Sequence, residues 1–143
     1  MKLDYSRPID QLTADMLSAG FFEGWPTAPD AATHLRVLRG SFEAIVAVDS
    51  ETGRVVGFIS AISDGVLAAY IPLLEVLPTH RGHGIGRELV RRMMQRLEDF
   101  YMIDVVCDES VLSFYEALGF HAGRSAIHRN YARQTGRAHD DSN

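Results

Sequence analysis

Residues 81–86, with the sequence RGHGIG, are the part of the chain whose composition and spacing are best suited to chemistry. They follow an apolar run from Val66 to Pro78 and open an amphipathic segment. Glycine has no Cβ, so a backbone with three glycines in five residues can come close to a ligand. A helix that begins here leaves its first N–H groups unpaired and carries a partial positive charge at that end. These residues therefore predict a site for a phosphate or pyrophosphate group.

Two familiar phosphate loops fit these residues poorly. A Walker loop needs a lysine after its last glycine, whereas Arg87-Glu88 stands there. A dinucleotide loop of the form G-x-G-x-x-G that starts at Gly82 needs a third glycine at position 87, one residue after Gly86. Asp104 lies at about the right distance for the acidic partner of such a loop, so dinucleotide binding stays as a competing hypothesis. That fingerprint normally belongs to a first βαβ unit, whereas this loop follows several expected strands.

A third pattern, [QR]-x-x-G-x-[GA], matches Arg81, Gly84 and Gly86. The run LEVLP at 74–78 leads into it as a strand, and FYEALGF follows at 114–120. In this order and spacing, residues 40–130 resemble the GCN5-related N-acetyltransferase superfamily, whose second signature is Y-E-x-x-G-F. The resemblance implies an α/β fold and the use of acetyl-coenzyme A as acetyl donor.

The resemblance also implies how the donor is held. Amides of the glycine loop would bind the pyrophosphate, and strand 75–77 would pair with the pantetheine as an added strand does. Arg87 and Arg91 either reach the adenosine 3′-phosphate or are simply solvated. The amide of Val76 or Leu77 is the expected donor to the oxyanion that forms during acyl transfer. The expected donor-binding residues are Val76, Leu77, Arg81, Gly82, His83, Gly84, Ile85, Gly86, Arg87 and Asp108.

Two side chains are expected to move protons. Tyr115 occupies the family's tyrosine position and would protonate the departing thiolate; the alternative is a core tyrosine. Glu75 is a carboxylate within an otherwise apolar strand, so burial would raise its pKa towards a value useful in a general base. The alternative for Glu75 is an outward-facing residue in water. Asp108 stands where the family often has asparagine, so it either contacts pantetheine or faces the acceptor.

These residues predict an N-acetyltransferase that moves the acetyl group to a primary amine by direct attack in a ternary complex. A small-molecule acceptor is expected because the chain has no recognition extension. The alternatives are a non-catalytic acyl-coenzyme A-binding sensor or partner module, and a nucleotide-binding oxidoreductase. No metal is expected, because His80 and His83 have no acidic or cysteine partner at ligand spacing.

Composition agrees with a soluble globular protein. The 143 residues carry a net charge of −5, which argues against nucleic acid as the main partner. Cys107 is the only cysteine, so no internal disulfide can form and a cytoplasmic location is expected. No signal peptide or membrane span is expected, and a homodimer is possible. Trp25, with Phe21 and Phe22, either lines an acceptor pocket or packs a loop.

Periodicity predicts helices over 9–19, 31–39 with Asp30 as N-cap, 83–99 and 109–118. Strands are expected over 3–6, 42–49, 54–63, 66–77, 102–107 (buried) and 120–131. Asp64-Gly65 predicts a two-residue hairpin, and Pro72 marks an edge, bulge or break in pairing. The expected fold is α/β, with a mixed, mostly antiparallel sheet flanked by about four helices. Residues 1–131 form one domain, and 132–143 are a polar, disordered tail.

Overall fold

A mixed five-stranded sheet forms the centre of the computed structural model, which describes residues 1–18 and 20–137. The strands lie side by side in sequence order. Neighbours pair antiparallel except for the last two, which are parallel. The strands are β1 (Leu3–Asp4), β2 (Glu43–Asp49), β3 (Val55–Ser63), β4 (Ala68–Val76) and β5 (Met102–Val105). The expected mixed, mostly antiparallel sheet is confirmed.

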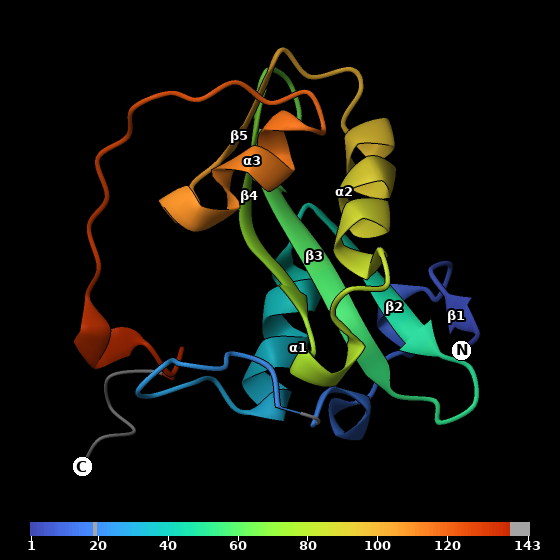
Figure 1. The fold of residues 1–143 in the computed structure, drawn as a ribbon. Coiled ribbons are helices and arrows are strands. Elements are labelled where there is room, and N and C mark those ends of the chain that lie inside the picture. Colours follow the sequence, from blue (N-terminus) through green and yellow to red (C-terminus); the bar gives the residue numbers. More distant parts are fainter. Residues whose placement is uncertain (19, 138–143) are drawn as a thin grey trace.

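Helices cover both faces of this sheet (Figure 1). The α-helices within the described residues are α1 (Ala31–Gly40), α2 (Ile85–Arg96) and α3 (Leu112–Glu116). Residues alternate between faces along a strand, so β2 sends Ile45 and Ala47 into one apolar cluster, with α2 and Tyr115. It sends Val46 and Val48 into a second cluster, with α1. Two cores therefore sandwich the sheet.

The start of α1 follows the expected chemistry. The Asp30 carboxylate accepts a hydrogen bond from the Thr33 N–H at 2.8 Å, which satisfies one of the unpaired donors of the first turn. This bond, with the Arg137 side chain, lowers the pKa of Asp30 to about 2. The predicted N-cap is confirmed.

The first predicted helix, over 9–19, is wrong. The chain instead forms two short 3₁₀ helices, Ile9–Gln11 and Ala14–Leu17, because Leu12 between them is extended. Leu12 and Leu17 are both buried in the core beneath α1. Separate turns bring both side chains to that core, so tertiary packing overrides the helical spacing of the apolar residues.

The last predicted strand, over 120–131, is not formed either. Residues 121–130 carry no strand, and Figure 1 shows them as a loop that stands away from the rest of the chain. The loop ends in a 3₁₀ helix, Tyr131–Arg133, and Gln134 then accepts a hydrogen bond from the Thr27 hydroxyl at 2.9 Å. A strand needs a neighbour to pair with, and among the described residues no strand pairs with this loop. The rest of the predicted tail, 138–143, lies outside the described residues.

Two smaller expectations are also corrected. β5 is half-exposed rather than buried, because it is the edge strand of the sheet. The turn after β3 extends to Leu67, since the Asp64 carboxylate accepts hydrogen bonds from the N–H groups of Val66, Leu67 and Ala68. These bonds lower the pKa of Asp64 and stabilise a wider turn than a two-residue hairpin.

Pro72 marks the point where β4 changes its pairing. Parallel pairing to β5 ends at Ile71 opposite Val105, so the second half of β4 has no neighbour on that side. On the other side the register to β3 shifts, because Ser60 pairs with Leu73 while Ile62 pairs with Tyr70. The extra β4 residue is a bulge. Proline, which has no N–H to donate, is suited to both features.

Candidate active site

The glycine loop joins the end of β4 to α2. A 3₁₀ turn, Pro78–His80, precedes it. Gly82 and Gly84 then take φ values of 82° and 79°, in the left-handed region that favours glycine. Gly84 caps α2 without any side-chain hydrogen bond, and the Glu88 N–H is the first to bond back to its carbonyl, at 3.1 Å. The amides of Ile85, Gly86 and Arg87 are thus donors available at a helix N-terminus.

Gly57 of β3 brings this helix end onto the sheet. A Cβ at Gly57 would lie 3.0 Å from Ile85 Cγ2 and 3.2 Å from Leu89 Cδ1, which is too close for ordinary packing. Sequence reasoning missed this role. The available signal was a lone glycine inside the β-branched run of 55–59, which is typical of a close approach by another element.

The open half of β4 offers one of the two expected oxyanion donors. The Leu77 N–H donates to the Val56 carbonyl at 2.9 Å, so the amide of Leu77 is used within the sheet. Val76, the residue before Leu77, lies opposite Gly57 of β3. Polar backbone groups alternate in direction along an antiparallel strand, so the Val76 N–H points to the open edge. Of the pair, Val76 has the free donor.

A cleft of about 540 Å³ lies along this open edge. It brings together most of the side chains and glycines that the sequence singled out. Three expected residues do not line it: Leu77 is buried, and His83 and Asp108 are exposed. The lining residues are Leu74, Glu75, Val76, His80, Arg81, Gly82, Gly84, Ile85, Gly86, Arg87, Val111, Phe114 and Tyr115.

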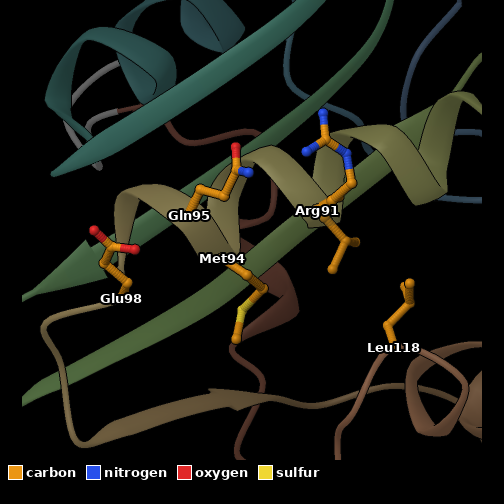
Figure 2. Close-up of a pocket in the computed structure, with 6 residues that line it drawn as sticks. Arg91, Met94, Gln95, Glu98 and Leu118 are labelled. Atoms are coloured by element: carbon orange, nitrogen blue, oxygen red, sulfur yellow. The ribbon is translucent and has the colours of Figure 1, made fainter.

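A second hollow, of about 280 Å³, lies farther along α2, between the C-terminal half of the helix and Leu118 (Figure 2). Figure 2 shows Arg91, Met94, Gln95 and Glu98 along the helix, with Leu118 opposite. Arg91 is held there by the Glu88 carboxylate, with a shortest distance of 2.6 Å. Arg87 therefore lines the main cleft and Arg91 does not. The two proton-transfer candidates, Glu75 and Tyr115, both belong to the larger cleft.

Glu75 is half-buried and is held by a residue far away in sequence. Its Oε1 accepts a hydrogen bond from the Phe22 N–H at 2.8 Å. Burial raises the pKa of Glu75, while the Phe22 bond and the Arg81 charge lower it and Glu23 raises it, so the net shift is upward. A raised pKa makes a carboxylate a better proton acceptor near neutral pH. The expectation of an outward-facing carboxylate in water does not apply.

Phe22 has a backbone conformation that L-residues rarely adopt. Its φ is 66°, and among the described residues no other non-glycine residue has a positive φ. Such a conformation persists only where the surroundings impose it. Here the ring packs against His34 and Phe58, with centroids at 4.9 and 6.1 Å, while the N–H donates to Glu75. Sequence reasoning missed Phe22 as a partner of Glu75, because no local pattern signals a contact across 53 positions.

The aromatic residues near Phe22 pack the loop and do not line the cleft. Phe21 contacts the rings of His34 and Phe58 at 5.3 and 5.2 Å, and Trp25 contacts Phe22 at 4.9 Å. His34 is fully buried, and burial lowers its pKa to about 4, so its ring is neutral. Of the two alternatives for Trp25 and its neighbours, the structure supports packing.

Tyr115 approaches the cleft from the other face of the sheet. Its ring is buried among the residues that pack against α2, beside Phe114 and Phe120 at centroid distances of 5.0 and 5.5 Å. Burial, with a smaller effect of Cys107, raises the pKa of the phenol to about 12. Tyr115 therefore holds its proton at neutral pH. Glu75 lies opposite Phe58 of β3, and Phe58 packs in the core with α1, so Glu75 is on the α1 face of the sheet. The acid and base candidates therefore approach β4 from opposite faces.

Arg81 links the donor loop to the Phe22 loop. Its Nε donates to the Val76 carbonyl at 3.2 Å, and its Nη2 lies 3.3 Å from a carboxylate oxygen of Glu23. Both charged side chains are more than half exposed, so this ion pair is weak. A phosphate bound at the glycine loop would therefore compete with Glu23 for the Arg81 guanidinium.

Residues 11–120 match the family model of the acetyltransferase (GNAT) family. The chain belongs to this family. The GNAT-like fold is confirmed as well, because a crystal structure of a candidate acetyltransferase from Deinococcus radiodurans R1 superposes with a TM-score of 0.90. That protein is 40% identical, over 95% of this chain and 94% of the other.

Curated relatives match over shorter stretches. GCN5-related N-acetyltransferase 3, chloroplastic, of Arabidopsis thaliana is 38% identical over 55% of this chain and 34% of its own length. Histone acetyltransferase TAP1 of Glycine max is 30% identical over 73% of this chain and 49% of its own length. The chain thus spans between a third and a half of the length of these two relatives.

The described residues hold no group of three or more histidine, cysteine, aspartate or glutamate side chains that could bind a metal ion. No helix within them is long and apolar enough to span a bilayer.

Proposed function

We propose that this GNAT protein is an N-acetyltransferase that moves an acetyl group from acetyl-coenzyme A to a primary amine. The observation that carries the proposal is the open edge of β4. It has a free Val76 amide, a glycine loop at one end, and Glu75 and Tyr115 on its two faces. A thioester in an extended chain can pair with such an edge, as an added β-strand does.

The glycine loop is suited to the donor's pyrophosphate. The amides of Ile85, Gly86 and Arg87 are available at the start of α2, and Arg81 and Arg87 add positive charge beside them. Pantetheine would pair with the β4 edge between Leu74 and Val76. The cleft gives no support to donor contacts by Leu77, His83 and Asp108, because none of these three residues lines it.

In the proposed reaction the amine nitrogen attacks the thioester carbonyl carbon directly. The carbonyl oxygen becomes an oxyanion, which accepts a hydrogen bond from the Val76 N–H; such donors contribute about 3–4 kcal/mol in other acyl-transfer sites. Glu75 takes a proton from the amine, directly or through a water molecule. The carbon–sulfur bond then breaks, and Tyr115 gives its proton to the departing thiolate. The products are the N-acetylated amine and coenzyme A.

The acceptor is a primary amine, and we favour a small molecule. Beside the proposed base, the carboxylates of Glu75 and Glu23 outnumber the single positive charge of Arg81, and this balance suits a cationic substrate. The soybean relative is named a histone acetyltransferase, so a protein lysine is the alternative acceptor. A cytoplasmic location remains a prediction, and the Arabidopsis relative is named as chloroplastic.

Two assays test the proposal together. Thermal unfolding is followed with acetyl-coenzyme A, coenzyme A, NAD or ATP, since a ligand at 100 times its Kd stabilises by about 2.7 kcal/mol. Free thiol release is then measured over a panel of polyamines, amino sugars, aminoglycosides and lysine peptides. We expect stabilisation by the coenzyme A forms and turnover of at least one small amine. Turnover of the peptides alone would exclude the small-molecule acceptor.

Two other results would contradict the proposal in different ways. Stabilisation by the coenzyme A forms, with no thiol release over the whole panel, would favour a non-catalytic acyl-coenzyme A sensor. Stabilisation by NAD or ATP alone would instead favour a nucleotide-binding protein, despite the position of the third glycine.

A further inference from the structure

His34 is a buried side chain that takes no part in the proposed reaction. It lies near the start of α1 and is 1% exposed, and its Nε2 has no hydrogen-bond partner among the described residues. A buried nitrogen without a partner destabilises the folded protein. Leucine would leave no such atom and is a better helix former. The packing of this core therefore does not by itself explain a histidine at this position.

The ring of His34 is the centre of a cluster of four rings. It contacts Phe21, Phe22 and Phe58 edge-on, at centroid distances of 5.3, 4.9 and 4.3 Å. The first two come from the loop before α1 and the third comes from β3. The contact with Phe58 is shorter than the range of about 4.5–7 Å that is usual for aromatic pairs. A small five-membered ring suits this space, and it joins the loop to the sheet.

The loop before α1 needs such a contact because of its backbone. Gly20, Phe22 and Gly24 have φ values of 101°, 66° and 85°, so every second residue has a positive φ. Glycine adopts these values at little cost, whereas phenylalanine does not. The contacts of the Phe22 ring therefore hold this residue in a conformation that its own backbone disfavours.

This conformation directs the Phe22 N–H to the proposed base. The N–H donates to Oε1 of Glu75 at 2.8 Å. Glu75 lies opposite Phe58, so the carboxylate and the cluster of rings share the α1 face of the sheet. With Oε1 held in this way, the direction in which Glu75 presents its other oxygen is fixed as well.

We propose that His34 is a positioning residue for Glu75, an inference that rests on the proposed function. The His34 ring holds Phe22 in its left-handed conformation, and the Phe22 N–H then holds the carboxylate of the base. His34 does not line the cleft, so its effect on the reaction passes through Glu75. The unsatisfied nitrogen is a local cost that accompanies a functional site.

The test follows the amide proton of residue 22 by NMR during a pH titration, for which a chain of 15.9 kDa is suitable. This measurement does not depend on turnover. His34→Leu removes the ring, and Phe22→Leu breaks the same contact from the side of the loop. Leu38→Val is the matched control, because Leu38 is also 1% exposed and lies one turn farther along α1 in the same core.

Glu75→Gln supplies the baseline of the titration, because it removes the ionisation and leaves His34 in place. Arg81 and Glu23 also act on the pKa of Glu75, and every variant keeps both of them. In the wild type and in Leu38→Val, we expect the amide shift to follow the ionisation of Glu75. This pH dependence should be lost in His34→Leu, in Phe22→Leu and in Glu75→Gln.

The kinetics should show the same dependence on Glu75. We expect His34→Leu to lower kcat by about tenfold, with the KM for acetyl-coenzyme A unchanged, because a misplaced base slows the chemical step. In the Glu75→Gln background the same substitution should lower kcat no further, since both changes act at one group.

Four outcomes would overturn the inference. A wild-type amide that ignores Glu75 would mean that there is no contact to position. A pH dependence that survives in His34→Leu would assign the conformation of Phe22 to other contacts. Its loss in Leu38→Val as well would assign it to the core as a whole. An equal fall of kcat in the Glu75→Gln background would show that His34 acts on another group.

Failure of the proposed function has a different signature. If the amide behaves as expected in all variants but no amine is acetylated, the positioning of Glu75 by His34 stands and the acetyl transfer does not.

Discussion

On the α2 face of the β4 edge, the cleft is bounded by a loop whose shape follows from local residue types. Gly82 and Gly84 are glycines at positive φ, and Tyr115 follows in a short motif. On the α1 face, Glu75 is placed by a bond from Phe22, 53 residues away, in a backbone conformation that only packing can impose. The side that we propose for the donor is therefore encoded locally, whereas the side that we propose for the acceptor depends on tertiary contacts.

This difference matters for how the two sides can vary. A site for one invariant donor can be built from backbone amides and glycines, which any sequence with the right turn can supply. A site that selects an acceptor and holds a base needs side chains from distant segments. The following experiments change one side at a time, in order of decreasing expected effect.

Replacing Tyr115 by phenylalanine removes the proposed acid and keeps the ring that packs beside Phe114 and Phe120. We expect kcat to fall by about 10²–10⁴-fold with little change in acetyl-coenzyme A affinity. Steady-state kinetics with calorimetric binding would check this. An unchanged kcat would leave Tyr115 as a core residue and nothing more.

Replacing Glu75 by glutamine removes the proposed base, while the remaining side-chain oxygen can still accept the hydrogen bond from the Phe22 N–H. We expect kcat to fall by about 10²-fold or more. Because burial raises the pKa of Glu75 in the folded state, its ionisation costs stability; that cost is full above the raised pKa and disappears below the ordinary pKa of a glutamate. The wild type should therefore gain stability relative to the variant as pH falls through the pKa of Glu75.

A pH series of kcat and of unfolding midpoints for wild type and Glu75→Gln separates these effects. The acid limb of wild-type kcat should follow the titration of Glu75 and lie above the ordinary pKa of a glutamate. A variant with full activity at neutral pH would assign the base to another group or to water alone.

Gly84 and Gly53 form a matched pair for the donor side. Both have positive φ, at 79° and 72°, and neither would bring a new Cβ within 4 Å of a neighbour. Alanine at either position should cost about 1 kcal/mol of stability from backbone strain. Only Gly84→Ala should raise the KM for acetyl-coenzyme A, by about tenfold, because its loop is the proposed site of the phosphates. Equal KM effects from both variants would point to a general loss of folding.

Replacing Glu23 by glutamine tests the link between the two sides. The Glu23–Arg81 ion pair is more than half exposed, so stability should change by less than about 1 kcal/mol. In the variant, phosphate binding no longer has to break the ion pair between Arg81 and Glu23. We therefore expect acetyl-coenzyme A to bind about two- to threefold more tightly at low salt. Weaker binding would mean that Glu23 holds Arg81 in its productive position.

The sequence alone determined the family, the glycine loop, the run of strands β2 to β4 and the helices α1 and α2. These features depend on short-range patterns, namely glycine at positive φ, caps and apolar periodicity, which act the same way in any surroundings. It also indicated Glu75, because a carboxylate in an apolar strand is visible in one line of residues.

Tertiary structure decided the rest. The register with β3 uses the Leu77 amide within the sheet and leaves the Val76 amide free. The packing against α1 brings the Phe22 N–H to the Glu75 carboxylate. Tertiary structure also replaced the helix over 9–19 by two turns and left residues 121–130 without a neighbour. The deciding free energy comes from contacts between segments far apart in sequence, or, for residues 121–130, from the lack of a strand to pair with. Local propensity cannot anticipate either.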